Sequence, residues 1–328
     1  LPIEVKFSRR VVEDADPYAY TLIIDSHLEV MKMKLYTVAI LGATGAVGQQ
    51  MLEILEERNF PVGKLVPLAS ARSAGKKLLF KGEEVTIQEV CAEAFQGVDI
   101  VLGAAENDIA KKFAPAIVKA GAVFVDNSSA FRLDPKVPLI VPEVNPEDIK
   151  LYKAENGGKG IIANPNCTTI MMVVVLNPIE KISHIKKIHI SSYQSASGAG
   201  AIAMEELKQQ YKDIIETGTT THINKFPFQL AYNVIPQIDK MTENDYTKEE
   251  MKMFNETRKI MHSNVQVSAM CVRVPALRSH SESIWVETER PISPEEAREA
   301  FAKGEGLVLM DNPAEKEYPM PLFLAGKD

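Results

Sequence analysis

The chain has 328 residues, of which 45% are hydrophobic and 25% charged, and its formal net charge is −7. This length predicts two domains, each large enough for its own hydrophobic core. The acidic balance argues against a nucleic-acid binder, and no apolar run approaches the ~18 residues of a membrane span. Three widely spaced cysteines, Cys91, Cys167 and Cys271, disfavour a disulfide framework or a metal site and favour a reducing compartment. We therefore expect a two-domain cytoplasmic enzyme.

The first thirty-odd residues differ from the rest of the chain. Residues 1–32 mix charged and apolar side chains without a clear period, and they lack the apolar core of a secretory signal. We interpret them as a non-family extension, a fusion remnant or read-through upstream of Met31 or Met33. A regulatory or partner-binding arm is the alternative.

Strands alternate with helices through the first domain, which we place at residues 33–164. Apolar, β-prone runs recur there, separated by segments with apolar residues at helical spacing. Such alternation predicts a Rossmann-type parallel sheet with right-handed crossovers. The expected strands are residues 36–41, 65–69, 99–102, 122–126 and 160–163, with helices after the first and third.

The second domain, residues 165–328, has longer strands. Strands interleaved with helices in this way predict an α+β domain with a mixed, partly antiparallel sheet. Ser293 is a plausible N-cap for the last helix, whereas residues 319–328 look like neither a capped helix nor a polar tail. The expected strands are residues 187–193, 265–274 and 283–289, and the expected helices are residues 168–182, 205–217, 244–262 and one from Ser293.

A glycine-rich turn follows the first strand. Gly42, Gly45 and Gly48 lie between that strand and a helix, where backbone amides and the helix N-terminus favour a phosphate. The spacing is not the strict Gly-x-Gly form, but the position predicts dinucleotide binding. A plain tight turn is the alternative.

The loop after the second strand bears on the type of dinucleotide. An acidic residue at this place would bind the ribose 2′-OH of NAD. The chain has Ser70, Arg72 and Ser73 instead, which suit a 2′-phosphate and favour NADP. A solvated loop with one arginine remains the alternative.

A cysteine begins the helix that follows the boundary near Asn164. Cys167 at a helix N-terminus is expected to have a lowered pKa, because the helix dipole favours the thiolate. His280, held between two strands, is the histidine best suited as its base. Spacing alone does not pair the two, so a buried structural cysteine stays open.

Five segments occur in an order that closely resembles one family. They are residues 42–48, 70–75, 141–145 (Val-Pro-Glu-Val-Asn), 164–169 (Asn-Pro-Asn-Cys-Thr-Thr) and the segment around His280. Together they resemble bacterial aspartate-β-semialdehyde dehydrogenases from about Lys34 to the end.

The resemblance implies NADP-dependent reductive dephosphorylation of L-aspartyl-4-phosphate to L-aspartate-4-semialdehyde. This step leads to lysine, through diaminopimelate, and to methionine and threonine. A cysteine thiolate displaces phosphate, and the resulting thioester is reduced. The resemblance also implies a homodimer or homotetramer, for which residues 226–233 are interface candidates.

Site residues follow from matching positions. Cys167 would be the nucleophile, His280 the acid/base and Gln194 the group that orients the intermediate. Arg273 would bind the substrate carboxylate, Glu249 its ammonium group, and Arg132, Asn166 and Lys252 the phosphate. From the residues alone, Glu249 and Lys252 could equally be a solvated helix pair, Arg132 a surface residue and Gln194 a strand end. The cofactor would contact Gly42, Thr44, Gly45, Ala46, Val47, Ser70, Arg72, Ser73, Ser197 and Gly198.

Some features depart from this pattern. Where many members have Ser-Ala-Gly, this chain has Ala104, Ala105 and Glu106, and the acidic residue could alter the cofactor preference.

The family continues beyond a segment like residues 319–328 into a final strand and helix, so we expect a C-terminally truncated cofactor site and weak or no turnover with NADP.

Other identities remain open. An N-acetyl-glutamyl-phosphate reductase shares the fold and chemistry, but its cysteine is usually flanked by glycine and Tyr-Pro, unlike Asn166 and Thr168 here. A glyceraldehyde-phosphate dehydrogenase shares only the Cys-Thr-Thr triplet. A truncated, inactive NADP-binding or assembly protein is the alternative of a different class.

Overall fold

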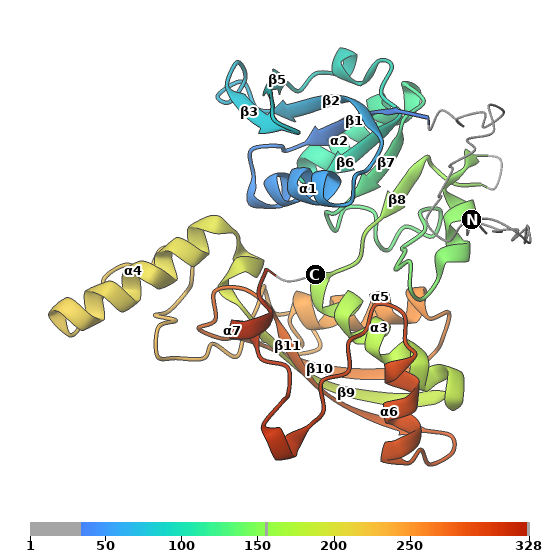
Figure 1. Cartoon of the computed structure of the whole chain (residues 1–328), viewed down its shortest axis with the longest axis vertical. Helices are drawn as coiled ribbons and strands as arrows, with labels where there is room; N and C mark the ends of the chain where they lie inside the picture. Colours follow the sequence, from blue (N-terminus) through green and yellow to red (C-terminus); the bar gives the residue numbers. More distant parts are fainter. Residues whose placement is uncertain (1–33, 155–156, 327–328) are drawn as a thin grey trace, which may run out of the picture. The chain divides into compact units, whose positions relative to one another are not determined.

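A six-stranded, all-parallel sheet organises the first half of the chain (Figure 1). The computed structural model describes residues 34–154 and 157–326, so the interpretation of residues 1–32 falls outside the described part. The expected Rossmann-type sheet is confirmed, with β2 three residues longer than expected. Its spatial order is β5 (Gln88–Glu89), β2 (Val62–Ala69), β1 (Tyr36–Leu41), β6 (Ile100–Gly103), β7 (Val123–Asp126) and β8 (Ile161–Ala163).

Helices cover both faces of this sheet. Successive side chains of a strand point to opposite faces. In β1, Val38 and Ile40 pack in one core cluster with Leu52 of α1 (Ala46–Glu57). The intervening residues of β1 pack in another cluster, with Phe113 of α2 (Asn107–Lys119). The continuous apolar run of β1 is therefore explained by burial on both sides, as is typical of parallel sheets.

A small hairpin, absent from the sequence predictions, follows β2. Strands β3 (Lys77–Phe80) and β4 (Glu83–Thr86) pair antiparallel. The two residues between them, Lys81 and Gly82, have φ of 49° and 79°. Positive φ at both central positions is what a two-residue hairpin turn requires. The strands are short and rich in charge, so they carry little hydrophobic periodicity.

A three-stranded mixed sheet organises the second half. Strand β9 (Ile185–Gln194) lies in the centre, parallel to β10 (Gln266–Arg273) and antiparallel to β11 (Ser281–Thr288). Helices α3 (Cys167–Ile182) and α5 (Lys248–Ile260) contribute to the same core as the buried side chains of these strands. The expected mixed sheet is confirmed.

Helix α5 begins four residues later than expected. Thr247 accepts a hydrogen bond from the Glu250 backbone, while the Glu250 side chain accepts one from the Thr247 backbone. This capping box fixes the start of the helix. Ahead of it, Asp245 has a φ of 63°, which ends helical geometry on that side.

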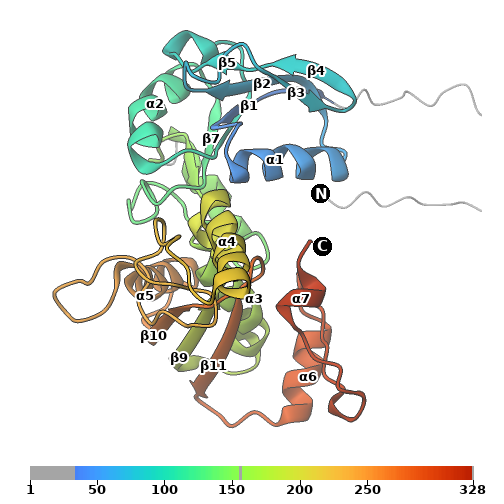
Figure 2. The same ribbon diagram turned by 90° about the vertical axis from the view of Figure 1, so that its left-hand side faces the viewer.

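Three further helices complete the second half. Figure 1 shows α4 (Ala201–Thr217) extending away from the sheets, and in Figure 2 the same helix lies in front of them. Its Leu207 packs with Phe226 and Leu230 of the loop that follows it. Ser293 caps α6 (Pro294–Ala302) as expected, again in a capping box. Residues 319–328 were not expected to form a helix, yet Pro321 starts the single turn α7 (Pro321–Leu324), since its fixed φ suits a first helical position. Short 3₁₀ turns occur at Ala92–Phe95, Pro146–Tyr152, Ala196–Ala199 and Pro313–Glu315.

The two halves meet in sequence between β8 and α3. We propose Asn164 as the domain boundary, because the last strand of the first sheet ends at Ala163 and α3 packs with the second sheet. Across residues 34–154 and 157–326, no helix combines the length and apolarity that a membrane crossing needs.

Candidate active site

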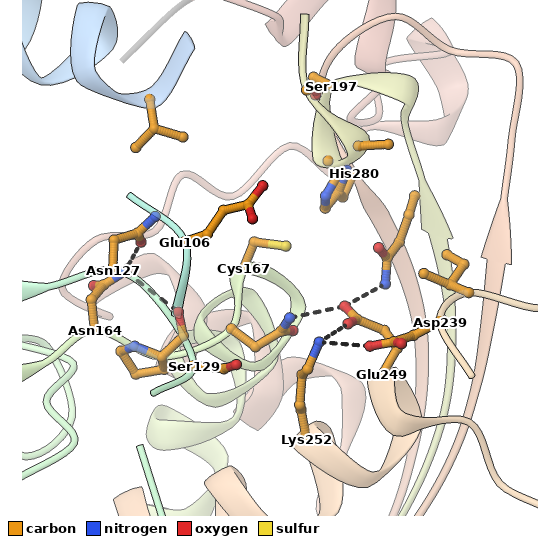
Figure 3. Close-up of a pocket in the computed structure, with 18 of the residues that line it drawn as sticks. Glu106, Asn127, Ser129, Asn164, Cys167, Ser197, Asp239, Glu249, Lys252 and His280 are labelled. Carbon is orange, nitrogen blue, oxygen red and sulfur yellow. Dashed lines mark hydrogen bonds and ion pairs between the residues drawn. The ribbon is translucent and has the colours of Figure 1, made fainter. Parts of the chain in front are cut away.

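A cavity of about 960 Å³ lies where the two halves meet. Its lining includes every residue that the sequence predicted as catalytic or substrate-binding. Figure 3 labels Cys167, His280, Glu249 and Lys252 among them. Residues distant in sequence converge there because parallel strands of the first sheet end at one edge, and β9, β10 and α5 reach it from the second half. The predicted residues that line it are Cys167, His280, Gln194, Arg273, Glu249, Arg132, Asn166, Lys252, Val47, Ser197 and Gly198.

Cys167 is the first residue of α3 and is exposed to the cavity. The preceding Asn166 caps the helix, since its Oδ1 accepts hydrogen bonds from the amides of Thr168 and Thr169 at 3.1 and 3.3 Å. The expected low thiol pKa is wrong. Burial among protein atoms and the negative charge of Glu249 raise the pKa of Cys167 to about 11, and this outweighs the Thr168 amide and two arginines. The thiol is neutral at pH 7.

Glu249 is the centre of a polar network on the cavity floor. Its Oε1 accepts hydrogen bonds from Asn166 Nδ2 at 2.8 Å and Gln194 Nε2 at 3.3 Å, and Lys252 Nζ lies 2.8 Å from its Oε2 (Figure 3). Burial would raise the pKa of Glu249, but Lys252 and the two amides outweigh it and lower that pKa. Glu249 is buried and ionised, so the solvated-pair interpretation is wrong for it.

Lys252 also reaches a second carboxylate, that of Asp239, at 3.3 Å. Burial would lower the pKa of Lys252, but Glu249 and Asp239 together raise it. The ammonium group is therefore charged at neutral pH and half-buried at the edge of the cavity.

Behind the cavity lies a buried ion pair that the sequence analysis missed. Arg132 Nη1 is 3.1 Å from Glu256 Oε1, and both side chains are almost fully buried. The other oxygen of Glu256 accepts the Asn166 backbone N–H at 2.6 Å, and Arg132 Nη2 donates to the Asn127 carbonyl at 2.9 Å. Glu256 thus holds both Arg132 and the residue preceding Cys167. The interpretation of Arg132 as a surface residue is wrong.

Lys259 holds the Arg132 segment from the same helix. Its Nζ donates to the carbonyls of Arg132, Asp134 and Val137 at 2.8, 2.7 and 2.6 Å. A helix turns once every ~3.6 residues, so positions 249, 252, 256 and 259 share one face of α5. That spacing was visible in the sequence. Because a charged helix face is usually solvated, the role of this face in the site was not predicted.

His280 and Arg273 form the opposite wall. Ser195 lies between them: its carbonyl accepts from Arg273 Nη1 at 2.7 Å, and its backbone N–H donates to His280 Nδ1 at 3.1 Å. Burial and the positive charge of Arg273 lower the pKa of His280 to about 4. His280 is therefore neutral at pH 7. Ser195 was also missed, because nothing in its sequence context marks it.

Gly198 is packed against both of these side chains. A Cβ at this position would lie 3.0 Å from Arg273 Nη1 and 3.2 Å from His280 Cε1 and Nε2. Gly198 does not adopt a positive φ, so the backbone itself tolerates alanine.

We expect Gly198→Ala to lower kcat/KM by about tenfold, less than the roughly hundredfold effect of a 1 Å misplacement, because Arg273 and His280 need to move by only a few tenths of an ångström. The measurement is steady-state kinetics together with Tm. An unchanged Tm with lost activity assigns the effect to the site, whereas full activity would contradict the packing argument.

The glycine turn forms a cradle that suits an anion. Gly42 has a φ of 94°, and a Cβ there would lie 2.6 Å from the Ala104 carbonyl oxygen. Helix α1 begins after Gly45, with no side-chain cap and no acidic residue in its first turn. Residues 44–47 are exposed. Uncapped, accessible amides at a helix N-terminus fit a dinucleotide phosphate.

The loop after β2 lies at the same edge of the sheet, because β1 and β2 are parallel neighbours. Ser70 and Arg72 are exposed there, while Ser73 is 9% exposed. Burial leaves Ser73 poorly placed to contact a cofactor phosphate. Glu106 precedes α2 without capping it through its side chain, and it lines the cavity that holds Cys167.

A dinucleotide-type sheet joined to a cavity with a cysteine, a histidine and convergent cations defines a dehydrogenase. Residues 37–152 match the model of the semialdehyde dehydrogenase NAD-binding domain. Residues 176–328 match that of the semialdehyde dehydrogenase dimerisation domain. The first half is thus a nicotinamide-dinucleotide-binding domain, and the chain is an oxidoreductase.

Individual relatives define the family further. The chain is 54% identical to the aspartate-semialdehyde dehydrogenase of Aquifex aeolicus, over 89% of this chain and 86% of that protein. It is 46% identical to that of Bacillus subtilis, over 89% and 85%. The crystal structure of aspartate semialdehyde dehydrogenase II from Vibrio cholerae superposes with a TM-score of 0.85 and 43% identity, covering 90% of this chain and 86% of that one. The chain belongs to the aspartate-semialdehyde dehydrogenase family.

Proposed function

We propose that the chain catalyses the NADP-dependent interconversion of L-aspartyl-4-phosphate and L-aspartate-4-semialdehyde, with release or uptake of phosphate. One observation carries this proposal: Cys167 shares a cavity with Arg132, Lys252, Arg273 and His280. A nucleophile surrounded by three cations suits a substrate that carries a carboxylate and an acyl phosphate. A second structure of the Vibrio cholerae relative, with a TM-score of 0.86 and 42% identity, is complexed with ASA.

The cavity walls supply the two ends of such a substrate with partners. The guanidinium of Arg273 suits the α-carboxylate, and the carboxylate of Glu249 suits the α-ammonium group. Arg132 and Lys252 suit the phosphate. Asn166 is the weakest of the phosphate-binding assignments, because its Oδ1 caps α3 and its Nδ2 already donates to Glu249. Gln194, held by Glu249, would orient the reacting carbonyl.

The reaction proceeds through a thioester on Cys167. The sulfur attacks the acyl carbon, a carbon–sulfur bond forms, and the carbon–oxygen bond to phosphate breaks. When bound, a reduced nicotinamide supplies the hydride that converts the thioester into a thiohemiacetal. Collapse of that species breaks the carbon–sulfur bond, releases the semialdehyde and restores Cys167. His280, predicted as the acid/base, would take the proton of Cys167 in the first step and return it when the thiohemiacetal forms, and the hydroxyl proton of that species would return to the Cys167 sulfur on collapse.

Activity with the expected substrate tests the proposal. Purified chain, L-aspartate-4-semialdehyde, phosphate and NADP should produce NADPH, even if only at the weak rate expected from the sequence, and omission of phosphate should stop the reaction. Production of NADPH from N-acetyl-glutamate semialdehyde but not from aspartate semialdehyde would instead identify an N-acetyl-glutamyl-phosphate reductase.

NADP rather than NAD is the cofactor that Arg72 favours. This exposed guanidinium follows β2, where an NAD enzyme would have an acidic residue. Ser70 is exposed beside it, and no described residue of this loop is acidic. Glu106 lines the cavity that holds Cys167, whereas Arg72 does not, so we expect the charge of Glu106 to leave binding of the 2′-phosphate unchanged.

Arg72→Ala should raise the KM for NADP about ten- to a hundredfold and leave the KM for NAD unchanged, since a hydrogen bond to a charged group contributes about 1.5–3 kcal/mol. Steady-state titrations with both cofactors measure this. Lys76→Ala, which removes an exposed charge from the same loop, is the matched control and should change neither value. Equal losses for NADP and NAD would contradict the assignment of Arg72.

We further propose a homodimer as the basic assembly, in keeping with the match to a dimerisation domain. The second sheet leaves Tyr193, Met270 and Trp285 exposed, and these are candidates for the interface. In the segment 226–233, Phe226, Leu230 and Ala231 are buried within the chain, so only its exposed Phe228 and Tyr232 remain interface candidates. We assign the protein to the cytoplasm, because the described cysteines are all free thiols.

A further inference from the structure

Lys225 is a further cation in the lining of the cavity that holds Cys167. Within residues 34–154 and 157–326, its ammonium group has no hydrogen-bond or ion-pair partner. The other lysine and arginine side chains of this lining all contact protein oxygens: Arg132 contacts Glu256, Lys252 contacts Glu249 and Asp239, and Arg273 contacts the Ser195 carbonyl. Lys225 therefore keeps its full hydrogen-bonding capacity for an anion that enters the cavity.

The position of Lys225 is that of a threshold between two cavities. A second cavity, of about 1040 Å³, is lined by residues 225–240, among them Phe228 and Lys240. Lys225 and Asp239 line both cavities, so they lie where the two join. Figure 3 shows Asp239 beside Lys252, whose Nζ is 3.3 Å from its carboxylate. Lys225 thus belongs to the same end of the cavity as the predicted phosphate-binding lysine.

A buried carboxylate fixes the backbone that carries Lys225. Glu206 of α4 accepts the backbone N–H groups of Asn224, Lys225 and Phe226 at 3.0, 2.6 and 3.2 Å. Glu206 is buried, whereas the side chain of Lys225 is exposed. The backbone of Lys225 is therefore held in place, while its flexible four-carbon stem can follow a ligand.

The charges of the lining leave a phosphate under-compensated without Lys225. The lining carboxylates are those of Glu106, Asp239 and Glu249. The cations Arg132, Lys252 and Arg273 only balance these charges. In L-aspartyl-4-phosphate the ammonium and the α-carboxylate cancel, and a phosphate group carries about −1.5 to −2 at pH 7. The ammonium of Lys225 supplies positive charge in excess.

We propose that Lys225 binds the phosphate group, of the acyl phosphate in one direction and of inorganic phosphate in the other, where the two cavities join. Lys225 acts there together with Arg132 and Lys252. Glu206 is its positioning residue, because it holds the backbone of Lys225 and lines neither cavity. This inference rests on the proposed function and adds a substrate-binding residue to it.

Lys225→Ala should raise the KM for inorganic phosphate about tenfold, the lower end of the effect of one charged hydrogen bond, because Lys225 is exposed to water. At saturating phosphate, kcat should fall less than about twofold, since the contact acts on binding. Lys225→Arg keeps the charge and should restore most of the affinity. An unchanged KM for phosphate, or an increase in the KM for aspartate semialdehyde or NADP instead, would overturn the assignment.

Lys240→Ala is the matched control. Lys240 is an exposed lysine that lines only the second cavity, and its own contact with Asp239 is made by its backbone N–H. Lys240→Ala should leave the KM for phosphate unchanged. If both variants raise this KM equally, the effect is one of net charge and the proposal is refuted.

A double-mutant cycle tests the role of Glu206. Glutamine offers one oxygen and no charge to the three N–H groups, so Glu206→Gln should loosen the Lys225 segment and raise the KM for phosphate about threefold. When Lys225 is already alanine, the same change should raise that KM no further. An equal increase in both backgrounds would show that Glu206 does not act through Lys225.

Binding of inorganic phosphate can also be measured without turnover. In ³¹P NMR titrations of the whole chain, the Kd for phosphate should rise about tenfold in Lys225→Ala and stay unchanged in Lys240→Ala. Equal affinity in the unsubstituted chain and Lys225→Ala, or no binding to either, would contradict the proposal. If the unsubstituted chain has no activity towards aspartate semialdehyde, the proposed function fails, while these titrations still decide whether Lys225 binds phosphate.

Discussion

Replacement of Cys167 by alanine is expected to abolish turnover of aspartate semialdehyde. In enzymes that use a covalent intermediate, loss of the nucleophile lowers kcat on the order of 10⁶-fold. The readout is phosphate-dependent formation of NADPH, with mass spectrometry for the acylated enzyme. Both signals should disappear in Cys167→Ala, and the fold should be retained, because the side chain is exposed to the cavity.

The chain supplies a matched control for this experiment. Cys91 is also an exposed free thiol, but it does not line the cavity. Cys91→Ala should keep normal turnover and acylation. Normal turnover in Cys167→Ala would contradict the thioester mechanism. In the free enzyme, alkylation of Cys167 should still be accelerating above pH 9, since the pKa of this thiol is about 11.

Glu256→Ala is expected to destabilise the protein by about 3–5 kcal/mol, the usual effect of removing one partner of a buried ion pair. Arg132 would keep a buried positive charge without its partner, and the Asn166 N–H would lose its acceptor. Urea unfolding measures the loss. The surviving folded enzyme should also show a raised KM for phosphate, because Arg132 loses its fixed position.

Two further variants make this prediction specific. Glu256→Gln keeps an oxygen for the Asn166 N–H and should lose less stability than Glu256→Ala. Glu84→Ala breaks an ion pair with Lys77 in which both side chains are more than half exposed, and it should change stability by less than about 0.5 kcal/mol. If Glu256→Ala and Glu84→Ala lower the free energy of unfolding by the same amount, the buried ion pair does not organise the site.

Hydrophobic periodicity predicted most of the elements that carry the buried clusters. The run that forms β1 is buried on both faces, and the helix after Asn166 has an apolar face that packs on the second sheet, so both patterns were strong. The hairpin β3–β4 escaped prediction because its strands are mostly exposed and charged. Hydrophobic periodicity reflects burial, so an element with few buried residues has little periodicity from which it could be predicted.

The sequence predicted those parts of the site whose chemical role is evident from neighbouring residues in the chain. The segment around Cys167 marked a nucleophile at a helix start. Glu256 was missed because its partner, Arg132, is 124 residues away. The predicted direction of the pKa shift of Cys167 was wrong. The helix dipole, on which the prediction rested, is a local effect, whereas burial and the charge of Glu249 depend on the folded environment. Ser195 acts on His280 through its backbone, which no residue type reveals.

One helix holds four of the charged groups that organise the cavity, and this makes the site sensitive to register. Each residue inserted in an α-helix rotates all later side chains by about 100°. A single insertion between Glu249 and Glu256 would therefore leave Glu249 in the cavity but turn Glu256 and Lys259 away from Arg132. A substitution in α5 can remove one contact at a time, but an insertion or deletion removes several contacts at once. The spacing of charges along α5 is therefore as much a part of the active site as the residues themselves.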